Sequence, residues 1–234
     1  MSTALFASTE GVTVREIYHN DLDEVVNELV LMSDSIQIAV RDATRALLDA
    51  DLALTERVIG GDARIDAQHD QLEQRAFTIL ARQAPVAGEL RTLVAVIQMV
   101  AALGRMGDLA AHVAKIARLR YPERAVPEPL RDNFRRMRRL AQDMIGNVGR
   151  VLAERNLEEA RELAEQDEEM DSLRSDQFRV ILGDDWQFGV EMAVDVALLG
   201  RYFERIADHA VAMGRRIIYI ITGDLPEGEN WPST

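Results

Sequence analysis

Carboxylates spaced four residues apart are the side chains of this chain that are best placed to do chemistry. Three pairs are complete, and a fourth place keeps only its second carboxylate because a glycine stands in the first. The positions are Asp62 with Asp66, Asp167 with Asp171, Glu204 with Asp208, and Gly104 with Asp108. Residues i and i+4 share one face of a helix, where two like charges repel by roughly a few tenths of a kcal/mol. Two such pairs on adjacent helices would gather up to four carboxylates, which are the ligands that hard cations prefer.

The acidic pairs recur because the chain itself is internally repeated. Apolar residues at coiled-coil spacing run from Val25 to Leu47 and return from Leu130 to Leu152, with each member displaced by 105 positions. The first two acidic pairs keep this displacement. The third helices match at a displacement of 100, so we expect a five-residue contraction in the connections, at residues 82–88 in the first half and 183–187 in the second.

Helix-forming residues dominate the chain, and breakers are few. There are 14 Gly and 6 Pro among 234 residues, and aromatic residues make up 5%. Asp51 and Asn156 are suited to cap the helices that follow them, and Gly223 is suited to end the last one. We therefore predict an all-α protein, a tandem duplication of a three-helix bundle with six long helices. The expected segments are an extension at 1–13, bundles at 14–121 and 130–223, a proline-rich linker at 122–129 and a tail at 224–234.

Composition narrows the class of function. The formal net charge is -13, which argues against nucleic acid or an anionic lipid surface as the main partner. The absence of Cys removes disulfides and thiolate metal sites. The longest uncharged stretch, Thr92 to Gly104, is shorter than the ~18 apolar residues of a membrane span, so we interpret it as a doubly buried core helix. No phosphate-binding glycine loop or nucleophile motif is present.

Helical periodicity also suggests where the acidic pairs point. At about 100° per residue, Glu204 and Asp208 fall roughly opposite the apolar side of their helix, flanked by small residues such as Ala197 and Gly200. We expect the pairs to face outward, with room above them. A solvated acidic face balanced by arginines would give the same pattern. Similarly, the basic run at 131–139 and the glutamates at 158–169 fit either pairing between neighbouring helices or a docking patch.

Two segments resemble the paired signatures of the PhoU family of phosphate-transport accessory proteins. They are Leu103 to Lys115 and Phe203 to Ala210, and the resemblance extends from about Val14 to Gly223. It implies two tandem three-helix bundles, often dimeric, in a cytoplasmic regulator that is not an enzyme. The implied partners are the phosphate ABC transporter ATPase subunit and a sensor histidine kinase. The implied activity is to restrain phosphate uptake and to keep phosphate-starvation genes off when phosphate is plentiful.

The resemblance also implies metal sites on the acidic motifs, for iron, zinc, manganese or magnesium. The expected ligands are Asp62, Asp66, Asp108, Asp167, Asp171, Glu204 and Asp208. Gly104 replaces a family carboxylate, which makes the first site the weaker one in this comparison. Two alternatives remain at this level. One is a metal-free interaction scaffold, and the other is a metal-dependent phosphohydrolase that would use His69 or His112 as its acid or base.

Overall fold

The computed structural model describes residues 14–83 and 85–224, and within these ranges the chain is almost wholly helical with no strand. The helices are α1 (Val14–Asp49), α2 (Leu52–Gln83), α3 (Gly88–Arg120), α4 (Arg131–Glu154), α5 (Leu157–Ile181) and α6 (Gly189–Thr222), with a short 3₁₀ turn at Glu128–Leu130 before α4. The all-α, six-helix prediction is confirmed. The proposed extension at 1–13 and most of the proposed tail lie outside the described residues.

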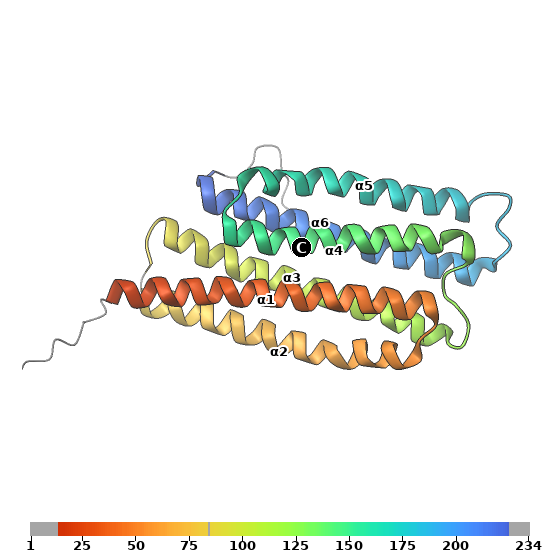
Figure 1. Cartoon of the computed structure of the whole chain (residues 1–234), viewed down its shortest axis with the longest axis horizontal. Coiled ribbons are helices and arrows are strands. Elements are labelled where there is room, and N and C mark those ends of the chain that lie inside the picture. Colours follow the sequence, from red (N-terminus) through yellow and green to blue (C-terminus); the bar gives the residue numbers. More distant parts are fainter. Residues whose placement is uncertain (1–13, 84, 225–234) are drawn as a thin grey trace, which may run out of the picture.

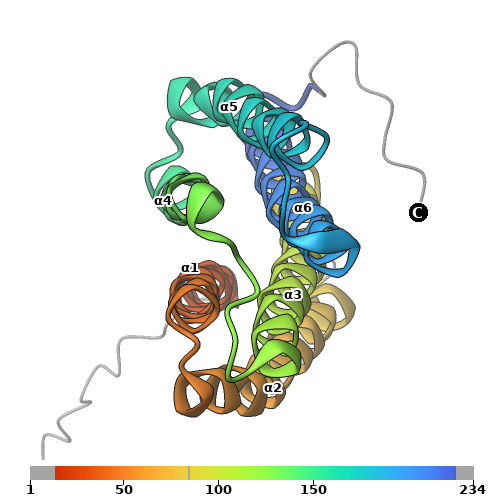
Figure 2. The ribbon, with the colours of Figure 1, turned by 90° about the vertical axis from the view of Figure 1, so that its right-hand side faces the viewer.

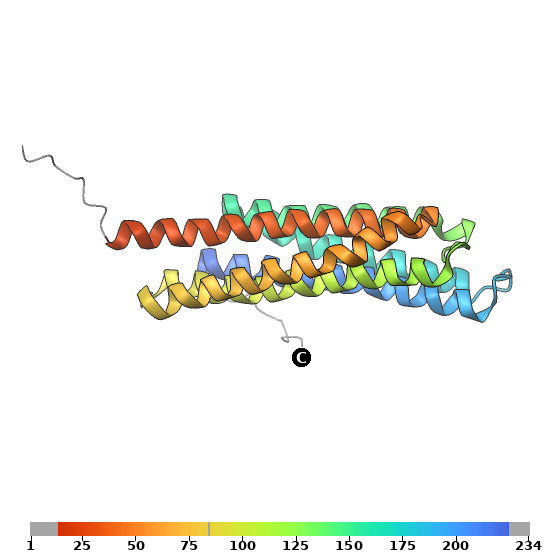
Figure 3. The ribbon, with the colours of Figure 1, turned by 90° about the horizontal axis from the view of Figure 1, so that it is seen from below.

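The six helices form two three-helix halves that pack side by side along their length (Figure 1). Consecutive helices run in opposite directions, as short connections favour. Seen end-on in Figure 2, α1 lies against α4 and α3 against α6, while α2 and α5 take the outer positions. Figure 3 shows α1 and α2 running alongside each other in the first half. The surfaces between α2 and α3, and between α5 and α6, are therefore equivalent.

The repeated apolar pattern builds the core. All of its members are buried except Ala39, which is half-buried, and the buried side chains of both halves form one continuous cluster. Phe134 of α4 and Phe203 of α6 meet in the second half with ring centroids 6.0 Å apart. Helix α3 is long and apolar enough to cross a membrane by composition alone. It packs against α1, α2 and α6, so Thr92 to Gly104 lies in a core helix. The stretch is not buried on all sides as we predicted, because Val94, Gln98 and Ala101 are exposed.

The predicted helix caps are present. The side chain of Asp51 accepts a hydrogen bond from the backbone N–H of Leu54 at 2.9 Å. The side chain of Asn156 accepts from the N–H groups of Glu158 and Glu159 at the start of α5. Gly223 ends α6 with a φ of 83°, a left-handed conformation that glycine adopts without strain.

The five-residue contraction of the second half, which we expected in the connection, lies instead in a shorter α5. Helix α2 continues through Arg82 to Gln83, whereas α5 ends at Ile181, seven positions before the equivalent of Gln83. The connection in the second half is correspondingly longer than the one in the first. The halves therefore differ in helix length as well as in the connection, because the Gly183-Asp184-Asp185 turn ends α5 early.

Candidate metal centre

Asp62 and Asp66 lie one turn apart on α2, and the structure brings their carboxylates to Asp108 on α3. One oxygen of each lies within 4.8 Å of the other two. Asp62 and Asp108 are half-buried and Asp66 is exposed. The Oδ1 atom of Asp62 is covered from solvent and has no hydrogen-bond partner in the described part of the chain. Hard cations bind carboxylate oxygens at about 2.0–2.6 Å, so one cation could contact all three residues. We call this group the first cluster.

The carboxylates of the first cluster repel one another. Burial raises the pKa of Asp62 above its ordinary value, and repulsion from Asp66 and Asp108 raises this pKa further, while Lys115 acts in the opposite direction. Arg105, which is mostly exposed, donates a hydrogen bond to Asp108 Oδ2 at 3.1 Å. A bound cation would relieve this repulsion more directly than an exposed arginine, since it would sit between the charges.

Gly104 stands where a fourth ligand would belong, and His69 occupies the space beside it. A Cβ atom added to Gly104 would lie 3.1 Å from His69 Cδ2. The imidazole Nδ1 lies 3.0 Å from Asp70 Oδ1. Under the displacements of the repeat, His69 and Gly104 correspond to Arg174 and Glu204 in the second half. The second half thus has an arginine and a glutamate at the two positions where the first half has a histidine and a glycine.

The second cluster comprises Asp167 and Asp171 on α5 with Glu204 and Asp208 on α6. Burial raises the pKa of Asp167 to about 6, with further contributions from Asp208, Asp171 and Glu204. The pKa of Asp208 is also raised, chiefly by burial and then by Glu204. The Oδ1 atom of Asp167 is covered and lacks a hydrogen-bond partner among the described side chains. Asp167 and Asp208 thus each experience repulsion from other carboxylates of the second cluster.

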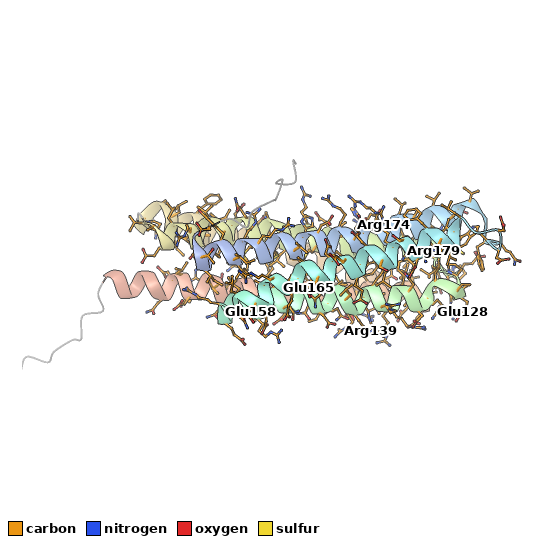
Figure 4. The ribbon with its side chains drawn as sticks, turned by 90° about the horizontal axis from the view of Figure 1, so that it is seen from above. Glu128, Arg139, Glu158, Glu165, Arg174 and Arg179 are labelled. Atoms are coloured by element: carbon orange, nitrogen blue, oxygen red, sulfur yellow. The ribbon has the colours of Figure 1, made fainter. Side chains whose placement is uncertain are left out.

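Arginines of the chain itself already hold one member of the second cluster. Arg174 Nη1 lies 2.8 Å from Glu204 Oε2, and Arg201 Nη1 lies 2.6 Å from Glu204 Oε1. Figure 4 shows Arg174 where α5 meets α6. Among the described residues, the convergence of three carboxylate oxygens within 4.8 Å occurs in the first cluster and not in this one.

The expectation that the pairs lie open to solvent is wrong for Glu204, which is buried with 9% exposure. Helix α5 fills the space that we expected above the small residues of α6. Gln177 packs directly over Gly200, and Leu163 packs over Gly214. Asp208 is half-buried, so the second cluster lies in the seam between two helices rather than on an open wall.

The remaining candidates lie near these clusters or pair with each other. The His112 ring is exposed and lies 5.5 Å from the Tyr202 ring. Arg136 on α4 pairs with Glu169 on α5 at 3.4 Å, and Arg150 pairs with Glu159 at 2.9 Å. Part of the basic run and of the glutamate series is therefore paired between neighbouring helices. Figure 4 labels Arg139, Glu158 and Glu165, which are exposed.

The chain is therefore a duplicated helical protein, in which each three-helix bundle carries an acidic cluster between its second and third helix. The PhoU domain matches residues 29–117 and 134–217. The chain belongs to the PhoU family.

Relatives across nearly the whole chain are named as accessory proteins. The phosphate-specific transport system accessory protein PhoU homolog 1 of Mycobacterium leprae is 44% identical over 94% of this chain and 100% of its own length. Homolog 2 of Mycobacterium tuberculosis is 45% identical over 91% of this chain and 100% of its own length. The crystal structure of PhoU from Streptococcus pneumoniae has the same fold, with a TM-score of 0.81 at 22% identity, covering 90% of this chain and 99% of that one.

Proposed function

We propose that this protein is a regulatory accessory protein of a phosphate-specific transport system. It would restrain phosphate uptake and keep phosphate-starvation genes off when phosphate is plentiful. The observation that carries the proposal is similarity over the full length. A relative of this name is 44% identical across 94% of the chain, and the family domain occurs in both halves.

The mechanism that we propose is that of an adaptor in the cytoplasm between the transporter ATPase subunit and a membrane sensor histidine kinase. An elongated bundle with one continuous core offers long, fixed helix surfaces on opposite sides, which suits contact with two partners. We expect the protein to act through these surfaces without catalysing a reaction, and to form a homodimer. Membrane association would be peripheral, through the partners.

We also propose that the first cluster binds a divalent or trivalent cation through Asp62, Asp66 and Asp108. The converging oxygens and the unpartnered Oδ1 of Asp62 support this assignment. Oxygen ligands suit magnesium or manganese, and iron or zinc could also bind. A cation in the second cluster would use Asp167, Asp171, Glu204 and Asp208, and would require Arg174 and Arg201 to release Glu204.

Binding to the proposed partners tests the regulatory assignment. The purified chain should retain the transporter ATPase subunit and the cytoplasmic part of the sensor kinase in pull-down experiments, and the amounts should respond to phosphate supply. Deletion of the gene should raise phosphate uptake under phosphate-replete growth. Failure to retain either partner under both phosphate conditions would remove the proposal's support.

Elemental analysis of the purified protein tests the metal assignment. We expect bound metal to be lost in Asp62→Asn/Asp66→Asn and to persist in the matched Asp167→Asn/Asp171→Asn variant. The reason is that Arg174 and Arg201 already neutralise Glu204, so the second cluster should hold little metal that could be lost. Equal loss in both variants would contradict the distinction between the clusters. Metal-free wild-type protein that still binds its partners would favour the alternative of a metal-free scaffold.

A further inference from the structure

Large exposed apolar side chains occur on both sides of the connection between α5 and α6. Val190, Val194 and Leu198 follow one another at intervals of four on α6, with exposed fractions of 81%, 51% and 43%. Phe178 and Leu182 are exposed on the last turn of α5 and just beyond it, and Phe188 is exposed in the connection. We call these six residues the apolar strip. Clustered exposed apolar surface of this kind marks interaction sites in soluble proteins.

The apolar strip is held in place by the connection between the helices. The ring of Trp186, which is partly buried against the core, meets that of Phe188 edge-on with centroids 5.1 Å apart. Its indole N–H donates a hydrogen bond to the Gly189 carbonyl at 2.9 Å. The connection is therefore ordered before any partner arrives, which lowers the entropy cost of docking.

The apolar strip leads directly into the second acidic cluster. The Arg174 guanidinium lies 5.3 Å from the centre of the Phe178 ring and also contacts Glu204. At about 100° per residue, Val190 and Val194 fall on the same side of α6 as Asp208. This side of α6 thus carries apolar side chains near the connection and, further along, Arg201 and Asp208.

The exposed charges at the connection between α5 and α6 are acidic, whereas Arg201 and the exposed Arg205 lie further along α6, beside Asp208. Arg174 is held by Glu204, and Arg179 pairs with Asp176 at 2.5 Å. Asp184 and Asp185, both exposed beside the strip, have no ion-pair partner in the described part of the chain. A ligand for this face should therefore be apolar on one side and positively charged at its edges.

We propose that the apolar strip docks an amphipathic helix of a partner protein, with its apolar face on Val190, Val194 and Leu198 and its Lys or Arg residues near Asp184 and Asp185. An amphipathic helix presents apolar anchors along one face, and residues four apart on α6 form a ridge against which such a face can pack. A helix lying from Val190 to Leu198 would span about two turns. The inference rests on the proposed regulatory function and assigns a surface to it.

The first half provides an internal comparison. Val190, Val194 and Leu182 correspond to three residues that are also apolar and exposed, Leu90, Val94 and Phe77. Phe178 and Leu198, however, correspond to Glu73 and Gln98, so the apolar surface there is interrupted by polar side chains. The complete strip is present only in the second half of the described chain, and we infer that docking belongs to that half.

Binding of a synthetic peptide to the full chain tests this inference. The probe is a fluorescently labelled amphipathic helical peptide with leucines on one face and lysines on the other, and its comparison peptide carries glutamate in place of lysine. The test variant is Val194→Ser/Leu198→Ser. The matched control is Leu31→Ser/Ile38→Ser, which removes two apolar side chains of similar exposure from α1. Circular dichroism and thermal melting confirm that both variants fold.

We expect the lysine peptide to bind and the glutamate peptide not to bind, as measured by anisotropy. Affinity should fall by roughly tenfold or more in the test variant and stay near wild type in the control, because two buried anchors are lost only in the former. Absence of binding, or equal loss in both variants, would overturn the inference. So would binding of the wild type, but not the test variant, to zwitterionic lipid vesicles in place of the peptide.

Two further outcomes separate this inference from others. If sedimentation shows a wild-type dimer that the test variant dissociates, the apolar strip is covered by a second copy and the docking inference is wrong. If the test variant retains the transporter ATPase subunit and the sensor kinase as well as wild type does, the inference fails while the proposed function stands. If wild type retains neither partner, the proposed function fails instead.

Discussion

Burial distinguishes the acidic residues of the two clusters from ordinary surface carboxylates. Asp62 and Asp167 each have a covered oxygen without a hydrogen-bond partner among the described residues, and burial is the largest cause of the raised pKa of both. A carboxylate that is partly desolvated beside other carboxylates favours its protonated form. Its negative charge therefore destabilises the folded state until a cation or a basic side chain approaches.

Asp167 should make stability fall as pH rises between about 4 and 6. Its folded pKa is about 6 against an ordinary 3.8, so the folded state holds its proton more tightly and this advantage is lost as pH rises through the folded pKa. In chelator-treated protein, Asp167→Asn should be more stable than wild type near pH 7, with the difference vanishing near pH 4. The gain should be about 1 kcal/mol once solvent screening is allowed for.

Urea unfolding at the two pH values measures this difference. Glu165→Gln, which removes an exposed carboxylate from the same helix, serves as the control and should change little. A gain for Asp167→Asn that is the same at both pH values would show that the carboxylate's charge is not its cause.

The residues of the clusters could be predicted from the sequence, but their surroundings could not. Spacing and repetition were sufficient to select Asp62, Asp66 and Asp108, whose oxygens converge. The burial of Glu204 was missed because the periodicity of α6 does not reveal that Arg174 of α5 reaches across it. That contact depends on how two helices pack, which is a tertiary property. The sequence offered one signal of this contact: Arg174 stands at the repeat position that His69 occupies in the first half, so a basic side chain accompanies Glu204 only in the second half.

At the scale of the element, glycines decide how closely the helices approach. A Cβ added at Gly214 of α6 would lie 2.6 Å from Leu163 Cδ1 and 3.1 Å from the Ala160 carbonyl oxygen on α5. At Gly60 and Gly61 of α2, by contrast, an added Cβ would meet nothing within 4 Å. Gly214 therefore permits a close approach of two helices, whereas Gly60 and Gly61 lie where no neighbouring element comes close. Caps such as Asn156 could be predicted because they depend on local sequence, whereas this close approach could not.

Replacing these glycines with alanine should change stability in opposite directions. Gly214→Ala should destabilise the protein by about 1–3 kcal/mol, because the new methyl group overpacks the α5–α6 seam. Gly60→Ala should stabilise it by about 1 kcal/mol, because alanine has the higher helix propensity and nothing opposes it. Denaturant unfolding measures both values. Stabilisation by Gly214→Ala would contradict the close packing of α5 on α6.

At the scale of the whole molecule, the two halves are equivalent in fold but share a single core. Helices α1 and α4 approach closely enough that a Cβ on Gly149 would lie 2.8 Å from Ser33 Oγ. At the other contact, Arg120 at the end of α3 pairs with Glu191 and with the buried Asp195 of α6. Each half thus depends on the other to cover one side of its helices.

We therefore expect the full chain to unfold in one cooperative transition, although its sequence is a tandem repeat. A fragment of residues 14–121 would expose the faces of α1 and α3 that the second half covers, because the apolar cluster continues across the boundary. Calorimetry should give equal calorimetric and van't Hoff enthalpies for the full chain, and the fragment should aggregate or melt at a much lower temperature. Two resolved transitions, with a fragment as stable as the intact protein, would mean that the halves are independent domains. In that case a partner bound at the α5–α6 seam could not influence the first cluster through the fold, since coupling between distant sites requires a packed structure that responds as one unit.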